Sequence, residues 1–161
     1  MIFVTVGTHE QQFNRLLEKV DFLKQKGILK DEVIMQTGFS KYEPKYCQSI
    51  NFIRYDDMAK YIDQARIVIT HGGPASFISV ISKGKTPIVV PRMSKYKEHV
   101  NDHQLDFARK LIKRGVNITL VEDIEFLEQS IIEQNSKIMS FDSNNENFNL
   151  SLKKIIIDLL N

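Results

Sequence analysis

The chain has 161 residues, 42% hydrophobic and 26% charged, with a formal net charge of +2. This length allows one globular domain with its own core, and the nearly balanced charge does not indicate a nucleic-acid partner. A single cysteine, Cys47, excludes an internal disulfide and is typical of a reducing compartment. Neither a signal peptide nor a run of about 20 apolar residues is visible, so we expect a soluble chain that reaches a membrane only through another protein.

Strands and helices alternate along the chain. Short apolar runs predict strands at residues 2–6, 33–35, 51–55, 67–69, 88–90 and 118–121. Apolar residues at helical spacing predict helices at about 13–23, 58–65, 74–83 and 101–114. Thr8 or His9 is expected near the cap of the first helix, and Gly115 at the end of the fourth. This pattern favours an α/β fold, in which helices cover both faces of a parallel sheet that binds ligands beyond the carboxyl ends of its strands.

The whole chain, 1–161, is predicted to form a single domain without internal repeats. An asparagine-rich stretch at about 140–150 predicts a polar loop, and apolar residues at helical spacing predict a last helix at about 151–160.

Two glycines separate the predicted strand 67–69 from the helix that follows it, in the sequence Thr-His-Gly-Gly-Pro-Ala-Ser at 70–76. Glycine permits a tight turn, and the free N–H groups of a helix N-terminus attract anions. Pro74 suits the first helical position, which leaves the N–H groups of Ala75, Ser76 and Phe77 as donors. The motif therefore indicates a phosphate-binding loop, although Gly-Gly after a strand is often only a turn.

A second polar segment, residues 91–104, follows the apolar run 88–90. It ends in Glu-His-Val-Asn-Asp-His-Gln at 98–104, where Asn101 or Asp102 suits a helix cap. Five polar residues in this stretch exceed what a cap requires, so we interpret the segment as a second functional loop. No Gly-x-Gly-x-x-Gly follows any predicted strand, which disfavours a dinucleotide oxidoreductase.

These motifs resemble the nucleotide-sugar-binding half of glycosyltransferase family 28 in its short, single-domain form. The resemblance covers most of the chain and rests on Gly-Thr-His at 7–9, Asp-Asp-Met at 56–58, residues 71–76, Gly-Lys-Thr-Pro at 84–87 and residues 98–104. It implies a Rossmann-like sheet equivalent to the donor-binding half of a GT-B enzyme. The similar proteins are the catalytic subunits of two-component bacterial capsule and exopolysaccharide transferases and of the eukaryotic dolichol-linked N-acetylglucosaminyltransferase.

The resemblance also implies roles for individual residues. The implied nucleotide-sugar-binding residues are Gly7, Thr8, Tyr55, Met58, Gly72, Gly73, Pro74, Ala75, Ser76, Arg92, Glu98, His103 and Gln104. Larger relatives carry an acidic residue for the ribose where this chain has Val80 and Ile81, so Glu98 is the candidate to replace it. His103 and Gln104 match positions that touch the donor sugar. Asp56-Asp57 is not expected to bind a metal, and helix capping is the simpler interpretation of that pair.

The implied function is an inverting glycosyltransferase subunit that transfers a hexose from a UDP-sugar to a polyprenyl-diphosphate-linked glycan, with no metal or other cofactor. A membrane-anchored partner would supply the acceptor-binding half and hold the chain at the cytoplasmic face of the membrane. The catalytic base would lie in that partner, with His9 and His71 as alternatives in this chain. A non-catalytic UDP-sugar-binding accessory subunit of the same system is the alternative function.

Overall fold

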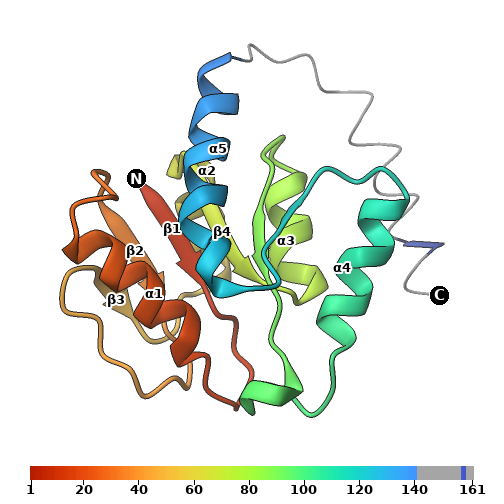
Figure 1. Cartoon of the computed structure of the whole chain (residues 1–161), viewed down its shortest axis with the longest axis horizontal. Coiled ribbons are helices and arrows are strands. Elements are labelled where there is room, and N and C mark those ends of the chain that lie inside the picture. The colour runs from red at the N-terminus through yellow and green to blue at the C-terminus, as the bar shows by residue number, and fades with distance from the viewer. Residues whose placement is uncertain (141–156, 159–161) are drawn as a thin grey trace.

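The computed structural model describes residues 1–140 and 157–158 (Figure 1). Most of the predicted polar loop and last helix therefore lies outside the described residues. Six strands form one sheet in the order β3-β2-β1-β4-β5-β6, and every neighbouring pair is parallel. The strands are β1 (Ile2–Thr5), β2 (Val33–Gln36), β3 (Gln48–Ile50), β4 (Ile67–His71), β5 (Ile88–Val90) and β6 (Thr119–Leu120). The parallel α/β sheet predicted from the sequence is thus confirmed.

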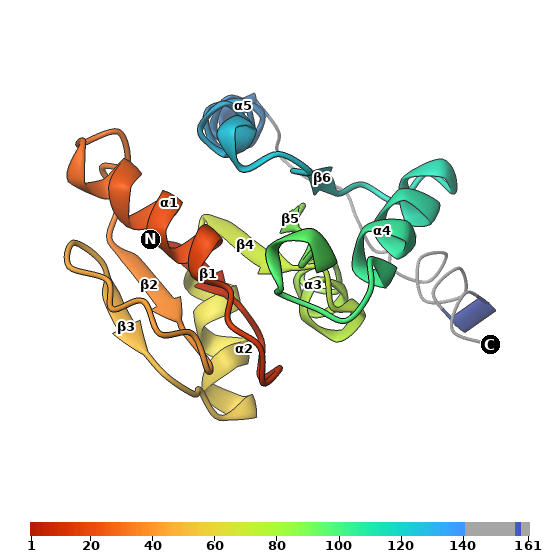
Figure 2. The same ribbon diagram turned by 60° about the horizontal axis from the view of Figure 1, so that its bottom comes forward.

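Helices cover both faces of this sheet (Figure 2). One face carries α1 (Asn14–Gln25) and α5 (Leu127–Ser140), and the other carries α2 (Tyr55–Gln64), α3 (Pro74–Ile81) and α4 (His103–Lys113). Successive strand residues point to opposite faces, as the pleat requires. Ile67 and Ile69 accordingly pack in the core under α1 and α5, whereas Val68 packs with α2 and α3.

The strand order places a topological switch point between β1 and β4. The chain proceeds from β1 to β2 on one side, and from β4 to β5 on the other. The loops that follow β1 and β4 therefore diverge at the carboxyl edge of the sheet, which is where open α/β sheets bind ligands.

Three predicted elements differ from the structure. Residues 51–55 are not a strand, because β3 ends at Ile50 and Tyr55 already begins α2, whose first turn carries Asp56 and Asp57. Acidic residues stabilise a helix N-terminus, and here that preference prevails over a short apolar run. Helix α1 begins at Asn14, beyond Thr8 and His9, and α5 was not predicted.

A long loop, residues 37–47, joins β2 to β3 and is held by the buried carboxylate of Asp21 on α1. The carboxylate accepts a hydrogen bond from the Tyr42 hydroxyl at 2.8 Å. It also accepts hydrogen bonds from the backbone N–H groups of Lys45, Tyr46 and Cys47 at 2.9, 2.8 and 3.1 Å. Burial raises the pKa of Asp21, but these hydrogen bonds outweigh burial and hold it below the usual value.

Candidate functional site

The candidate site lies at the carboxyl edge, where the loops after β1, β4 and β5 meet. Buried polar side chains line this edge: Thr5, Gln36, Thr70, His71, Arg92 and Glu98 are each at most 9% exposed. Polar groups are costly to bury unless they form hydrogen bonds. Their concentration at one edge therefore marks a site constructed for a polar ligand or for holding several loops together.

The imidazole of His71 lies at the centre of the switch point, between two glycines. A Cβ built on Gly7 would lie 2.4 Å from His71 Nε2, and one on Gly73 would lie 2.2 Å from Cε1. Both positions thus require glycine because the ring occupies the space, a reason that the sequence pattern did not reveal. The N–H of Gly73 donates to Nδ1 at 3.1 Å, and Nε2 lies 2.7 Å from Ser76 Oγ.

His71 remains uncharged at neutral pH. Burial is the main cause that lowers its pKa to about 3, and the nearby Arg92 cation lowers it further. The ring is 9% exposed, and both of its nitrogens have partners within the protein. The structure therefore corrects the suggestion that His71 is a catalytic base, because the ring has no free lone pair to accept a proton.

Gln104, in the first turn of α4, connects the glycine loop to the segment after β5. Its Oε1 accepts the backbone N–H groups of Gly72 and Arg92, both at 3.0 Å, and its Nε2 lies 3.4 Å from His71 Nδ1. A Cβ on Gly72 would lie 2.7 Å from Gln104 Cβ. Gln104 therefore holds two loops in place, a role different from the predicted contact with the donor sugar.

Arg92 and Glu98 are both fully buried, which corrects their predicted ligand contacts. Glu98 forms a two-pronged ion pair with Arg15 of α1, at 2.8 Å to Nε and 2.9 Å to Nη2, and accepts the Met93 N–H at 3.1 Å. Arg92 donates to four backbone carbonyls, those of Val6, Gln11, Gln12 and Glu98. Neither side chain reaches solvent, so a ribose contact by Glu98 does not fit this structure.

Other basic residues of the 83–97 segment also have structural partners. Lys85 donates to the carbonyls of Ile62, Asp63 and Ala65 at the end of α2, and Lys83 pairs with Asp63. A lysine at a helix C-terminus satisfies carbonyls that have no partner within the helix. These two lysines therefore stabilise α2, while Lys95 and Lys97 remain exposed.

Two half-buried histidines, His9 and His99, face each other across the loops after β1 and β5, with ring centroids 4.8 Å apart. Nδ1 of His9 accepts the Gln11 N–H at 3.2 Å, and Nδ1 of His99 accepts the Asn101 N–H at 3.4 Å. A neutral imidazole whose Nδ1 is an acceptor carries its hydrogen on Nε2 and acts there as a donor. The predicted base role of His9 therefore has no free lone pair in this arrangement, and His99 adds a donor that the sequence analysis did not identify.

The remaining predicted site residues surround these histidines in different ways. Thr8, Ala75 and His103 are exposed in or beside the three loops, and Tyr55 is 89% exposed at the start of α2. Helices α2 and α3 both contribute to one hydrophobic cluster, through Ile62 and Val80 respectively. Met58 is half-buried and packs against that cluster. Pro74 occupies the first position of α3, as predicted.

The electrostatic character of the edge favours an anion. Arg15 and Arg92 carry two positive charges against the single negative charge of Glu98, so the buried cluster retains one positive charge. Burial is the main cause that lowers the pKa of His9, and the Arg92 charge lowers it further, so this buried charge is felt at the loop that follows β1. The N-terminus of α3 adds a positive helix-dipole end. The site is therefore suited to a phosphate-bearing ligand.

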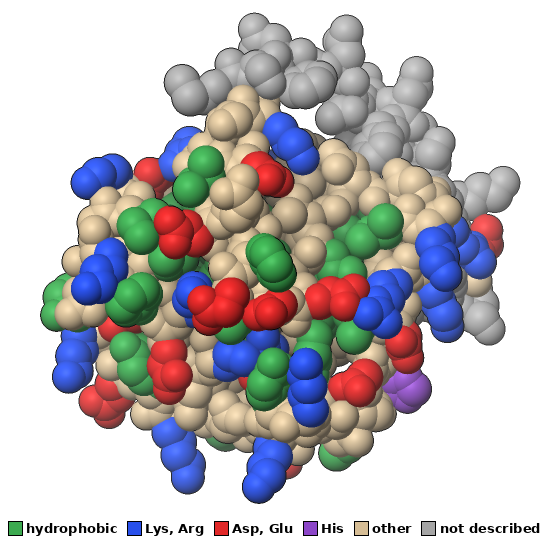
Figure 3. All heavy atoms as spheres, in the orientation of Figure 1, with side chains coloured by type: hydrophobic (Ala, Val, Ile, Leu, Met, Phe, Trp, Pro, Cys, Tyr) green, Lys and Arg blue, Asp and Glu red, His purple; other side chains and the backbone are tan. Residues whose placement is uncertain are grey.

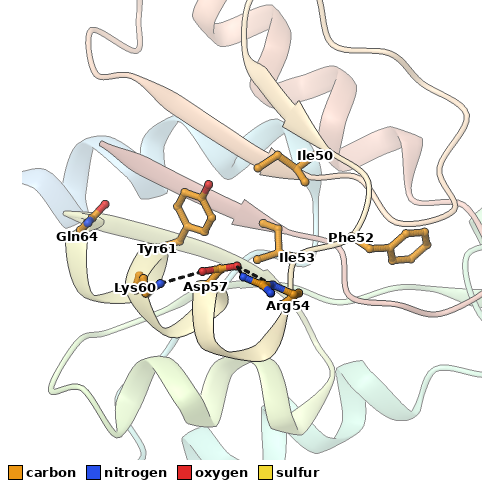
Figure 4. Close-up of a pocket in the computed structure, with 8 residues that line it drawn as sticks. All are labelled: Ile50, Phe52, Ile53, Arg54, Asp57, Lys60, Tyr61 and Gln64. Carbon is orange, nitrogen blue, oxygen red and sulfur yellow. Dashed lines mark hydrogen bonds and ion pairs between the residues drawn. The ribbon is translucent and has the colours of Figure 1, made fainter.

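A hollow of about 380 Å³ lies beside α2 (Figure 4), and none of the residues that line it belongs to the glycine loop. Ile50, Ile53 and Tyr61 form its apolar wall, and Asp57 forms ion pairs with Arg54 and Lys60 at its rim. Asp57 is one carboxylate for two cations, but the side chains of Arg54 and Lys60 are 87% and 69% exposed, so solvent and salt screen their charges at this rim. Elsewhere, the face seen in Figure 3 intersperses acidic and basic side chains.

Within the described part of the chain, no three His, Cys, Asp or Glu side chains are grouped to hold a metal ion. The helices at 1–140 and 157–158 include none with the length and apolar character needed to cross a bilayer.

The fold and the carboxyl-edge site define a Rossmann-like domain of the kind found in GT-B glycosyltransferases. The structure resembles the kitacinnamycin glycosyltransferase with a TM-score of 0.61 and 15% identity, over 84% of this chain and 34% of that chain. It resembles the calicheamicin glycosyltransferase CalG4 with a TM-score of 0.52 and 14% identity, again over 84% of this chain and 34% of that one.

The family model named "Glycosyltransferase family 28 C-terminal domain" matches residues 1–160, and the chain belongs to this family. The UDP-N-acetylglucosamine transferase subunit ALG13 of Homo sapiens is 33% identical over 123 residues, and that of Mus musculus is 32% identical over 124. These alignments cover 71% and 70% of this chain but only 10% of each relative. The Yarrowia lipolytica subunit is 29% identical over 102 residues, covering 60% of this chain and 50% of the relative.

Proposed function

We propose that this chain is the donor-binding subunit of a glycosyltransferase and that it holds a UDP-sugar at the carboxyl edge of the sheet. The observation that supports this most directly is the family match over residues 1–160, which includes all three loops of the site. The name of the mammalian relatives suggests UDP-N-acetylglucosamine as the first donor to test.

The proposed chemistry is direct displacement at the anomeric carbon. The acceptor hydroxyl oxygen forms the new bond to C1, its proton passes to a base, and the bond between C1 and the diphosphate oxygen breaks as UDP leaves with the electron pair. Donors that stabilise the departing charge need not include a metal ion. Ser76, the N-terminus of α3 and the net positive charge beneath the loops are the proposed contributors.

The proposed base is in a partner subunit. In this chain, Nδ1 of His9 and Nδ1 of His71 both accept backbone N–H groups, which leaves each neutral ring as a donor at Nε2. We therefore assign proton acceptance to a membrane-anchored partner that also binds a polyprenyl-diphosphate-linked glycan, as in the synthesis of capsular or other exported polysaccharides. Such a partner would hold this chain at the cytoplasmic face of the membrane.

An apolar rim around the site supports a partner at this edge. Its members come from the loops after β2, β3 and β5 and from the start of α2: Phe39, Phe52, Tyr55, Tyr96 and Val100, which are 40–89% exposed. Phe39 and Phe52 form an edge-to-face pair with centroids 5.0 Å apart. Exposed apolar side chains that contact one another, as Phe39 and Phe52 do, are characteristic of interaction sites.

Two experiments test the proposal. Calorimetric titration should show binding of UDP and UDP-N-acetylglucosamine in preference to ADP and NAD, unchanged by EDTA. Equal affinity for ADP would contradict a uracil site, and loss of binding with EDTA would contradict a metal-free site. Co-expression with a candidate partner that carries a membrane helix and a Rossmann-like domain should produce sugar transfer to a lipid-linked acceptor. Binding without transfer in that complex would instead favour the non-catalytic accessory role.

The rim is tested by co-purification with the same partner. Phe39→Ser and Phe52→Ser should weaken capture of the partner, whereas Ile112→Ser, at the opposite end of α4 and 42% exposed, should not. Equal capture by all three variants would exclude the rim as the contact surface.

A further inference from the structure

We infer that His71 is a positioning residue whose Nε2–H donates to Ser76 Oγ and thereby makes the Ser76 hydroxyl a fixed donor toward an anionic ligand. This inference rests on the proposed function for the identity of the ligand, a nucleoside diphosphate. The orientation of the hydroxyl follows from the protein alone.

The orientation of the Gln104 amide is the first step. Its oxygen accepts two backbone N–H groups, those of Gly72 and Arg92, each at 3.0 Å. Backbone N–H groups only donate, so the opposite rotation of the amide would place its NH₂ group against two donors. The end of the Gln104 amide that lies 3.4 Å from His71 Nδ1 is therefore its NH₂ group.

The position of the His71 hydrogen follows from these contacts. Nδ1 faces the Gln104 NH₂ group and the Gly73 N–H, which lies 3.1 Å away. With donors on this side, Nδ1 must be the acceptor, and the hydrogen of the neutral ring is on Nε2. Burial keeps the pKa of His71 near 3, so this arrangement is stable throughout the physiological pH range.

The Ser76 hydroxyl then keeps its own hydrogen free to donate. Its Oγ lies 2.7 Å from His71 Nε2, and because Nε2 is the donor, Oγ is the acceptor of that bond. Within the described residues, Oγ has no other hydrogen-bond partner. Ser76 is half-buried in the first turn of α3, beside the glycine loop, so its O–H is available to a ligand bound in that loop. Such a donor favours an ionised phosphate oxygen, which can only accept.

This arrangement excludes a different function for the same two residues. A Ser–His pair 2.7 Å apart is also the geometry of an activated nucleophile, but activation requires His to accept the serine proton. Here Nε2 already carries a hydrogen, so Ser76 is not activated and no covalent intermediate is formed on it.

Gly7, one of the two glycines that enclose the ring, provides a second argument for positioning when it is compared with Gly84, which lies far from the ring. Gly7 and Gly84 share a φ of +73°, but a Cβ on Gly7 would meet the His71 ring whereas one on Gly84 would meet nothing within 4 Å. Backbone strain is therefore similar at the two positions, and only Gly7→Ala displaces the imidazole. Loss of ligand affinity beyond that of Gly84→Ala measures the contribution of the ring position.

The ligand-free protein provides the first test. Long-range ¹H–¹⁵N NMR spectra of histidine-labelled protein, assigned with His71→Gln, should show Nε2 protonated and Nδ1 unprotonated from pH 5 to 8. A ring protonated at Nδ1, or charged in this range, would overturn the inference whatever the protein binds.

Calorimetry with UDP provides the second test. Ser76→Ala and His71→Asn should each weaken UDP binding about 10- to 100-fold. Ser76→Ala removes the hydroxyl that donates to the charged ligand, and His71→Asn removes the group that donates to that hydroxyl. His71→Gln places an NH₂ group where Nε2 was and should remain within about threefold of the wild type. Gly7→Ala should bind UDP more weakly than Gly84→Ala. Equal losses in His71→Gln and His71→Asn, with Ser76→Ala unaffected, would refute the positioning role. If the wild type does not bind UDP, the proposed function fails, and the NMR result still decides the orientation of His71.

Discussion

The buried ion pair of Glu98 provides the clearest prediction of stability. Glu98→Ala would remove the carboxylate that pairs with Arg15 and leave the Met93 N–H without its acceptor. The Arg15 side chain is 13% exposed and Glu98 is 1% exposed, so solvent would do little to compensate. Breaking a buried pair by deleting one partner costs about 3–5 kcal/mol. For a domain of this size, that corresponds to a decrease of about 6–20 °C in melting temperature.

Urea denaturation of Glu98→Ala tests this magnitude, with Glu125→Ala as the matched control. Glu125 likewise pairs with a cation of α1, Lys19, but the Glu125 side chain is 72% exposed, and an exposed pair contributes only about 0–1 kcal/mol. We therefore expect a large loss of unfolding free energy for Glu98→Ala and almost none for the control. A Glu98→Ala protein that unfolds within about 1 kcal/mol of the wild type but binds UDP poorly would refute the structural role and restore the ribose contact.

Three further predictions concern other parts of the chain. The pKa of Asp21 is lower in the folded protein than the value near 4 in the unfolded chain, so its carboxylate stabilises the fold above that unfolded pKa, and this stabilisation is lost as the pH falls through the folded pKa. Acidification from pH 7 to 3 should therefore destabilise the wild type more than Asp21→Asn in urea titrations. Burial, followed by the Asp21 charge, raises the pKa of Cys47 to about 12, so iodoacetamide should modify this thiol slowly at pH 8 and faster in Asp21→Asn. Rapid labelling of the wild type would show that the pKa of the thiol is not raised. Lys97 has a φ of +56°, a left-handed conformation that strains residues with a side chain. Denaturant titrations should therefore show that Lys97→Gly raises the unfolding free energy by up to about 1 kcal/mol and that Lys97→Val lowers it, and the opposite order would exclude strain at this turn.

The sequence was sufficient to predict the sheet because the strand signals are local. Runs such as Ile67–Ile69 are apolar on both faces, and this is typical of a parallel strand covered by helices on both sides. Pro74 and Gly115 also occupy the predicted first helical position and C-terminal turn. Helix α5 was missed because Gln134 takes a core-facing position, where it contacts Thr119 and the Thr86 carbonyl. A buried glutamine interrupts the apolar stripe by which helices are predicted.

The roles of individual site residues were less predictable, because they depend on partners distant in the sequence. Glu98 and Arg15 are 83 residues apart, and Arg92 reaches the carbonyl of Val6 86 residues away. A polar residue in a loop has the same local sequence whether it binds a ligand or neutralises a buried charge. No spacing rule distinguishes these cases before the fold is known.

The structure separates the polar residues of the edge into two layers. Arg15, Arg92, Glu98, Gln104 and His71 form an inner layer that joins the loops after β1, β4 and β5. Thr8, His9, Ser76, His99 and His103 form an outer layer that reaches the surface of the site. The inner layer retains one positive charge and fixes the direction of at least one outer donor. Apart from His71, which acts through Ser76, substitutions in the inner layer should therefore alter ligand binding only together with stability or loop geometry. Substitutions of outer side chains should alter binding in a protein that folds normally. Measuring both quantities for each variant distinguishes the two layers, which activity alone does not.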